Sequence, residues 1–157
     1  MSTRRNLNVR VLALCAVGAV MASALGVASA LAAPPQAATF SVIEQFDPES
    51  GVFTSDGSIL CASGTTSNEF FPSGFQSNTG IVFHDRKTIT CDDGSGTFTL
   101  LLQARTGFNV GDDGTVGGWV VLSGTGDYVG LHGQGTLTGT YLPNGIDEAY
   151  EGRLAYR

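Results

Sequence analysis

After residue 33 the sequence repeats one pattern, in which short runs of alternating apolar and polar residues are separated by turns rich in Gly, Asp and Asn. None of these runs shows the longer apolar period of a surface helix. Alternation with a period of two places the two kinds of side chain on opposite faces of a β-strand. The pattern predicts an all-β chain of seven or eight strands. The predicted strands lie at 39–46, 52–62 (two short strands around Asp56-Gly57), 81–91, 97–105, 119–123, 134–141 and 148–156.

Seven or eight short strands with hairpin connections either close into a barrel or stack as a sandwich. Glycines stand on the apolar faces of the last two runs, at Gly135, Gly139 and Gly152. A missing side chain lets a strand bend sharply and leaves room where the interior of a barrel narrows. We therefore predict an antiparallel, eight-stranded, closed β-barrel over residues 39–157, with a β-sandwich as the alternative.

Two segments are predicted to lie outside the strands. Residues 33–38 are interpreted as a Pro/Ala linker, and residues 63–80, rich in Gly, Ser, Thr and Asn, as a long loop. Three aromatic residues interrupt the polar composition of that loop, at Phe70, Phe71 and Phe75. They either form a lip at the mouth of the barrel or fold back into it as a plug.

The N-terminal segment has the layout of a secretory signal. Residues 1–10 carry three arginines and no acid, and residues 11–33 carry no charge. Small residues before the bond after Ala32 suit a signal peptidase, so we predict a signal peptide at 1–32 and a secreted protein that does not stay in a membrane. Arg4-Arg5 resembles a twin-arginine signal, so the export route is either the general secretory route or the twin-arginine route. The alternative is a retained anchor, because ~20 apolar residues can span a bilayer.

Two cysteines remain outside the predicted signal, which contains Cys15. Cys61 and Cys91 stand thirty residues apart. An exported chain with two cysteines most simply forms one disulfide bond. The alternatives are two free thiols or a pair of metal ligands, for which the chain offers few further ligands.

The charge balance disfavours nucleic acid as a partner. The chain has 14 Asp and Glu against 8 Lys and Arg, and three of the basic residues lie in the predicted signal. The formal charge of −6 becomes −9 without residues 1–32, so no basic surface remains to neutralise phosphates. Two acid pairs lie beside glycines, at Asp92-Asp93 and Asp112-Asp113, and are interpreted as turns rather than calcium ligands. We expect no metal and no cofactor.

The second half of the chain carries a family resemblance. Residues 123–137 read Ser-Gly-Thr-Gly-Asp-Tyr-Val-Gly-Leu-His-Gly-Gln-Gly-Thr-Leu, and Tyr150-Glu151-Gly152 follows. Over about residues 80–156 the chain resembles the allene oxide cyclase and dirigent barrel superfamily, and it is similar to bacterial barrel-like domains of unassigned function. The resemblance implies an eight-stranded antiparallel barrel with an apolar interior. Some relatives bind small hydrophobic molecules, and the plant enzymes form oligomers, so the resemblance also allows a homo-oligomer.

The activities of that superfamily are not carried over to this chain, because no residue here matches their catalytic residues. We expect a barrel that binds a small hydrophobic molecule without catalysis. The alternatives are an interaction module with a filled core that works through its loops, and an isomerase or cyclase acting inside the barrel. The residues expected to line the ligand site share the apolar faces of the strands and are Phe40, Val42, Phe98, Leu100, Trp119, Val121, Leu137, Tyr141, Tyr150 and Leu154.

Three charged residues share the parity of the apolar faces. Glu44 alternates with Phe40 and Val42, and Asp85 and Lys87 alternate with neighbouring apolar residues of their own run. In regular strands these groups would point into the barrel, where burial raises the pKa of a carboxyl group and makes Glu44 and Asp85 candidate acids or bases. A Glu44–Lys87 or Asp85–Lys87 pair would then reduce the cost of burial. The favoured interpretation is instead a bulge or turn at 84–87 that directs the charges towards water.

Overall fold

The computed structural model describes residues 34–47, 49–71, 76–77, 80–107 and 114–157. The predicted signal peptide, Phe75 and the Asp112-Asp113 pair lie outside these residues. Nine β-strands and one turn of 3₁₀ helix make up the described part of the chain. They are β1 (Gln36–Phe46), β2 (Glu49–Ser55), β3 (Ser63–Phe71), β4 (Gln76–Ser77), β5 (Gly80–Cys91), β6 (Thr97–Gly107), β7 (Gly114–Gly124), η1 (Gly126–Tyr128), β8 (Leu131–Leu142) and β9 (Gly145–Tyr156).

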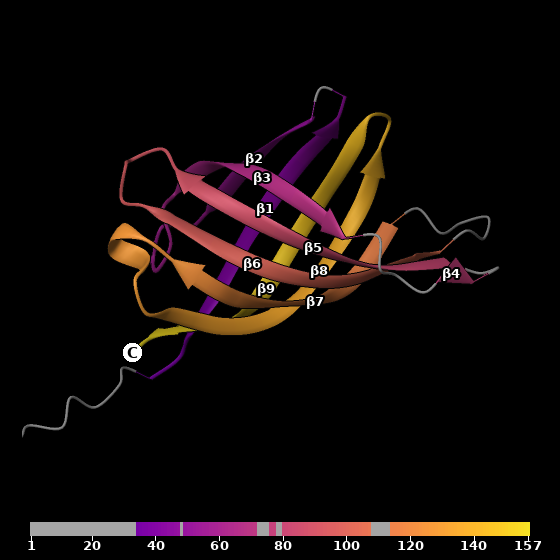
Figure 1. Cartoon of the computed structure of the whole chain (residues 1–157). Helices are drawn as coiled ribbons and strands as arrows, with labels where there is room; N and C mark the ends of the chain where they lie inside the picture. Colours follow the sequence, from indigo (N-terminus) through magenta and orange to yellow (C-terminus); the bar gives the residue numbers. More distant parts are fainter. Residues whose placement is uncertain (1–33, 48, 72–75, 78–79, 108–113) are drawn as a thin grey trace, which may run out of the picture. The chain divides into compact units, whose positions relative to one another are not determined.

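The strands form one antiparallel sheet that closes on itself (Figure 1). The order is β3-β2-β1-β9-β8-β7-β6-β5-β4, and an additional ladder between β3 and β5 completes the ring. The short β4 pairs only with the start of β5, so the barrel itself has eight strands. The predicted closed barrel is therefore confirmed, and the β-sandwich is excluded.

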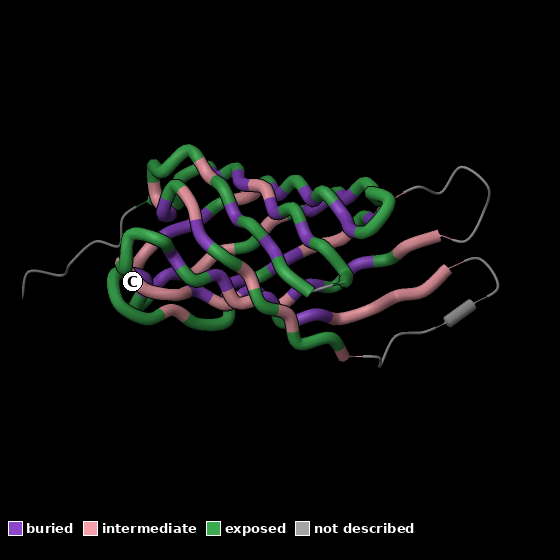
Figure 2. Tube along the Cα trace, turned by 90° about the horizontal axis from the view of Figure 1, so that it is seen from above, coloured by how far each residue is buried: buried purple, intermediate pink, exposed green. Residues whose placement is uncertain are grey.

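Buried residues alternate with less buried ones along many of the barrel strands (Figure 2). In β6 the set that begins with Phe98 and Leu100 is buried, while Gln103 on the other face is exposed. The register between β6 and β7 shifts once, between Thr99 and Leu100. The period-two pattern of the sequence is thus the pattern of a barrel wall with an apolar inner face.

Two of the predicted boundaries are wrong. The segment 33–38 is not a linker, because β1 begins at Gln36 and pairs there with Leu154 of β9. The segment 63–80 is not a continuous loop, because β3 fills its first half and pairs with both β2 and β5. Before Phe70, the inward side chains of β3 are small or polar, as at Thr66 and Asn68, so no apolar period marks this strand in the sequence.

One strand expected near Asp56 is also absent. Residues 56–62 form a connection between β2 and β3 in which the carboxylate of Asp56 accepts hydrogen bonds from the backbone N–H and the hydroxyl of Ser58 at 3.0 and 2.7 Å. Here an Asx turn replaces the tight hairpin that the Asp-Gly pair suggested. The predicted hairpin of 81–91 and 97–105 is confirmed as β5 and β6.

Aromatic rings fill one half of the lumen. The ring of Phe40 stacks on Tyr150 with centroids 4.6 Å apart and meets the edge of Trp119 at 5.4 Å. Two glycines make room for the indole, because a Cβ atom added at Gly135 or Gly152 would lie 2.7 or 2.5 Å from Trp119 carbons. The glycines on the inward faces of β8 and β9 therefore serve close packing against a large ring.

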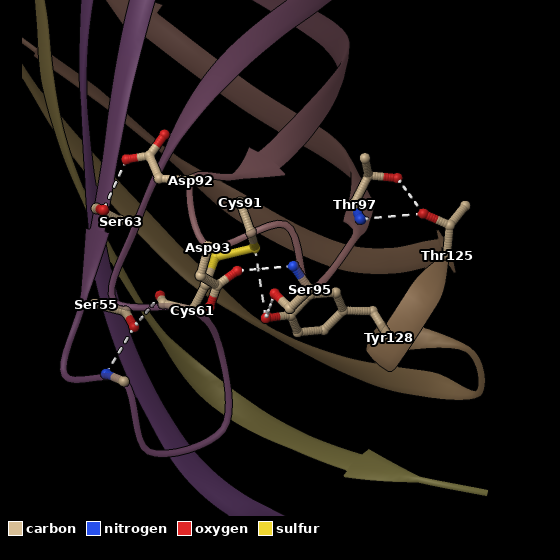
Figure 3. The surroundings of a disulfide bond; sticks show 11 residues. Ser55, Cys61, Ser63, Cys91, Asp92, Asp93, Ser95, Thr97, Thr125 and Tyr128 are labelled. Atoms are coloured by element: carbon tan, nitrogen blue, oxygen red, sulfur yellow. Dashed lines mark hydrogen bonds between the residues drawn. A yellow bond between two sulfur atoms is a disulfide. The ribbon is translucent and has the colours of Figure 1, made fainter.

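A disulfide bond lies at the same end of the barrel (Figure 3). Cys61, at the end of the β2–β3 connection, is joined to Cys91, the last residue of β5. The hydroxyl of Tyr128 in η1 lies 3.4 Å from the Cys91 sulfur and 3.1 Å from the Ser95 hydroxyl. The bond and the tyrosine together hold three connections across this end of the barrel, which we call the closed end.

Glycine is required in the Gly-Thr-Gly stretch. Gly126 has a φ of 59°, and a Cβ atom there would lie 2.2 Å from the carbonyl oxygen of Ser95. The hydroxyl of the preceding Thr125 accepts a hydrogen bond from the Thr97 backbone N–H at 3.1 Å. The stretch therefore fixes η1 against the β5–β6 turn.

Candidate functional site: a cavity at one end of the barrel

The β1–β2 and β8–β9 hairpins lie at the opposite end of the barrel (Figure 1). This end contains a cavity of about 450 Å³. This volume falls within the range of small-molecule sites in proteins. All eight strands of the barrel contribute to the wall, each with a residue near one of its ends. The apolar part of the wall comprises Phe46, Phe70, Ile81, Phe83, Tyr141 and Ile146.

An ionic cluster lies between this cavity and the aromatic core. Lys87 on β5 has no exposed surface, and its Nζ atom donates hydrogen bonds to Glu148 and to the hydroxyl of Tyr150, the latter at 2.9 Å. A third contact, 2.8 Å long, joins Nζ to Oε1 of Glu44. Strand β9, which carries Glu148 and Tyr150, lies four places from β5 in either direction around the ring. Lys87 therefore crosses the lumen to the opposite wall.

The cluster determines the protonation states of Lys87 and Tyr150. Burial lowers the pKa of Lys87, but the charges of Glu148 and Glu44 outweigh it and place the pKa above the ordinary lysine value. Burial and then the charge of Glu148 raise the pKa of Tyr150 well above its ordinary value. At neutral pH the lysine is therefore charged, and the tyrosine keeps its proton and donates it to Glu148 at 2.7 Å.

Three of the residues that line the cavity each carry a buried polar atom with no hydrogen-bond partner among the described residues. These atoms are Oδ1 of Asn68, Oδ1 of Asp85 and Oγ1 of Thr115. The exposed fractions of Asp85 and Thr115 are only 6% and 3%. Folded proteins leave few buried polar atoms unpaired, because each one loses a hydrogen bond to water without replacement. Because three such atoms belong to the lining of one cavity, its polar wall has hydrogen-bonding capacity that the described residues do not use.

Asp85 is a cavity carboxyl group with a raised pKa. Burial is the largest cause of the rise to about 7, the Lys87 charge opposes it, and the charges of Glu44, Glu148 and Glu49 contribute to it. Because the folded chain holds this proton more tightly than the unfolded chain, the contribution of Asp85 to stability falls as the pH rises from about 4 to about 7. Near neutral pH this group exchanges its proton readily.

Asp85→Asn is therefore expected to stabilise the protein in a pH-dependent way. The variant should be more stable than the wild type at pH 8 by about 2 kcal/mol, an order-of-magnitude value that allows for solvent screening. Near pH 4 the difference should vanish, because the carboxyl group is then protonated in the folded chain. Urea unfolding at both pH values measures this effect. Asp147→Asn on the exposed face of β9 is the control, and an equal effect of both substitutions would contradict the assignment.

The structure places the ten predicted lining residues in two groups. Nine of them, all except Tyr141, are buried in the core, where they pack against one another and fill the lumen. Tyr141 lines the cavity, and its hydroxyl donates to Thr106 at 3.0 Å. The aromatic lip predicted for the loop is present in part, since the exposed Phe70 lines the cavity beside the Phe83 ring at 5.5 Å. The Phe71 ring instead lies under the guanidinium of Arg86.

The predicted bulge at 84–87 is wrong. β5 keeps an unbroken register with both β3 and β6 through these residues, so Asp85 and Lys87 face the lumen together with Glu44, while His84 faces outward. Of the two ion pairs considered, the contact between Glu44 and Lys87 is present. The regular pairing of β5 with both β3 and β6 outweighed the local tendency of a charged run to turn towards water.

The sequence analysis missed three residues of the candidate site. Glu148 shares the parity of Tyr150, so following the alternation of its strand back by one step would have found it. Asn68 lies on the unrecognised β3, and Thr115 lies in the first part of β7, ahead of the strand predicted at 119–123.

The acid pair Asp92-Asp93 forms a turn, in which the carboxylate of Asp93 accepts a hydrogen bond from the backbone N–H of Ser95 at 2.9 Å.

The fold and the cavity define a closed eight-stranded antiparallel barrel that is filled at one end and hollow at the other. In comparisons with protein-family models, curated proteins and solved structures, no match to this chain was found. The resemblance to the allene oxide cyclase and dirigent barrels therefore stays a prediction. Among the residues that the structure describes, no helix is long and apolar enough to cross a membrane, and no three His, Cys, Asp or Glu side chains are grouped to hold a metal ion.

Proposed function

We propose that this protein is exported and binds a small, mainly apolar molecule in the cavity at the hollow end of the barrel, without chemical change. The observation that supports this most is that the cavity combines an apolar wall with buried, unpartnered polar atoms at Asp85 and Thr115. A few placed polar groups in an apolar concave wall are typical of small-molecule sites. Export is supported by the layout of residues 1–32 and by the Cys61–Cys91 disulfide, which persists in oxidising compartments.

The filled-core alternative describes only the closed end. There the aromatic residues are buried and pack against one another, and the ionic cluster around Lys87 lies between them and the cavity. Beyond that cluster the walls continue, and the described side chains leave the cavity of about 450 Å³. A module that works through its loops alone would have no need of this hollow.

An isomerase acting inside the barrel is the second candidate, and one observation favours it. Asp85 is buried in the cavity wall with a pKa of about 7, which suits a group that accepts and returns a proton. Glu44 is less suited, because its Oε1 atom already receives Lys87 at 2.8 Å and the Asn68 amide at 2.9 Å. A bound compound recovered chemically unchanged after long incubation supports binding alone, whereas conversion that Asp85→Asn abolishes supports the enzyme.

Blocking the mouth of the cavity is expected to abolish binding. The probe is N-phenyl-1-naphthylamine, a neutral dye that brightens in apolar sites. Ile81→Trp should weaken the affinity for the dye by at least about tenfold, because Ile81 lines the cavity and the larger indole would occupy part of its volume. The matched control is Val82→Trp, one residue along β5 on the other face, which should leave the affinity unchanged.

The exported full-length chain provides a second test. Native mass spectrometry of the protein purified from the culture medium should show extra mass that is lost on denaturation, and the mass of the processed chain should correspond to cleavage after Ala32. Dye binding that is equal in the wild type and in Ile81→Trp would contradict the proposed site.

A further inference from the structure

The unpartnered atoms of the cavity are mostly hydrogen-bond acceptors. The Oδ1 atom of Asn68 is a carbonyl oxygen, and the amide nitrogen of the same side chain is already used on Glu44 at 2.9 Å. The Oδ1 atom of Asp85 belongs to a carboxyl group, which, when it is ionised, can only accept hydrogen bonds. Only Thr115 Oγ1 can act in either sense. A ligand that satisfies this wall must therefore bring donors.

The charges around the cavity point the same way. Its described lining includes Glu44, Glu49, Asp85 and Glu148 but no Lys, Arg or His. The cation beneath it, Lys87, already contacts Glu44, Glu148 and the Tyr150 hydroxyl, which accounts for its three N–H donors. Among the described residues that line the cavity, no cation therefore pairs with Asp85, whose carboxyl group receives only the electrostatic effect of the shared Lys87 charge. A carboxylate with no partner in a buried wall is costly unless it is protonated or meets a cation.

We propose that the ligand of this cavity is an apolar molecule with one protonated amine, whose ammonium group is bound by the Asp85 carboxylate with the Asn68 amide oxygen as a second acceptor. This inference rests on the proposed function and specifies its ligand class. The apolar wall formed by Phe70, Phe83 and Ile146 takes the body of the molecule. An ammonium group supplies the donors and the positive charge that this end of the barrel lacks.

The two other ligand classes fit less well. A carboxylate or phosphate ligand would approach several acids with no cation free to receive it, so its burial would be opposed. A neutral apolar molecule would cover Asp85 without pairing it, which leaves the desolvation of that group uncompensated. The negative formal charge of the whole chain also raises the local concentration of cations rather than anions.

Three probes with one chain length separate these classes. Octylammonium, 1-octanol and octanoate are each titrated against bound N-phenyl-1-naphthylamine at pH 8. Octylammonium should bind at least about tenfold more tightly than octanol, and octanoate should bind least. Asp85→Asn should reduce the preference for the ammonium over the alcohol to within about threefold, and octanol should bind the variant at least as tightly as the wild type, because no carboxylate is then desolvated. The matched control, Asp147→Asn on the outer face of β9, removes the same charge and should keep the full preference.

Proton linkage supplies a readout that a simple structural role would not change. The groups that face Asp85 are Lys87, Glu44, Glu148 and Glu49, and with them Asp85 takes up a proton near neutral pH. Octylammonium should therefore bind more weakly at pH 5 than at pH 8 by about tenfold, whereas octanol should bind no more weakly at pH 5.

The outcomes distinguish this inference from the function on which it rests. If the dye and octanol bind but the ammonium is not preferred, or if Asp85→Asn keeps the preference, the inference on ligand class is overturned and the binding function stands. If neither the dye nor any of the three probes binds, both are overturned. A preference that depends on Asp85 and on pH supports both.

Discussion

Lys87→Met is expected to lower the free energy of unfolding by about 3–5 kcal/mol, as is usual when one partner of a buried ion pair is removed. The side chain of Lys87 is fully buried, and methionine of similar length would leave Glu44 and Glu148 without their shared cation. Both carboxylates would then have to take up protons or draw water into the lumen. Urea unfolding at pH 7, followed by the fluorescence of Trp119, measures the loss.

The adjacent residue provides the control for this prediction. Arg86 on the outer face of β5 contacts Glu69, with exposed side-chain fractions of 44% and 59%. Arg86→Met should cost no more than about 1 kcal/mol, because exposed ion pairs contribute little. In the Lys87→Met background, replacing Glu44 and Glu148 with Gln should recover part of the stability, since the stranded charges are then removed. Equal losses from the substitutions at 86 and 87 would contradict the role given to Lys87.

Removing the disulfide bond is expected to cost about 3–4 kcal/mol, the value of the chain-entropy model for a loop of this length. The bond closes a loop over a sequence separation of 30 and joins the β2–β3 connection to the end of β5. Cys61→Ala combined with Cys91→Ala removes it while keeping small apolar side chains at both buried positions. Thermal and urea unfolding of this variant and of the wild type under reducing conditions should show matching losses.

The double alanine variant also tests whether the cavity is independent of the disulfide at the closed end. Because neither cysteine lines the cavity, the affinity for N-phenyl-1-naphthylamine should stay unchanged at temperatures where the variant is folded. A reducing agent should have no effect on the variant itself. A loss below about 1 kcal/mol would show that the unfolded chain gains little freedom when this bond is absent.

The parts of the fold that could be predicted are those whose inner face is apolar. β6 alternates cleanly from Phe98 to Ala104, and the hairpin that it forms with β5 follows from the turn between them. β3 could not be predicted in the same way, because it buries Thr66 and Asn68 against Glu44 instead of burying apolar side chains. A strand that faces a polar part of the lumen shows no period of apolar residues, and only its pairing with β2 and β5 reveals it.

The candidate site was predictable in its elements but not in its location. Parity alone placed Glu44, Asp85 and Lys87 on inward faces, and it would have added Glu148. The predicted lining residues, in contrast, were chosen because they are apolar and inward-facing. In an eight-stranded barrel the interior is only just wide enough for such side chains, so large rings such as Phe40 and Trp119 fill the space rather than line it.

By itself, the sequence determined the all-β class and the inward or outward direction of most side chains. These properties depend on the period of a single strand and on local turn chemistry. Only the tertiary structure decided that Lys87 reaches the opposite wall, that one end of the lumen is filled and that the other is hollow. Those properties depend on which strands the closed ring sets face to face, and that arrangement follows from the long-range pairing of β3 with β5 rather than from any local pattern.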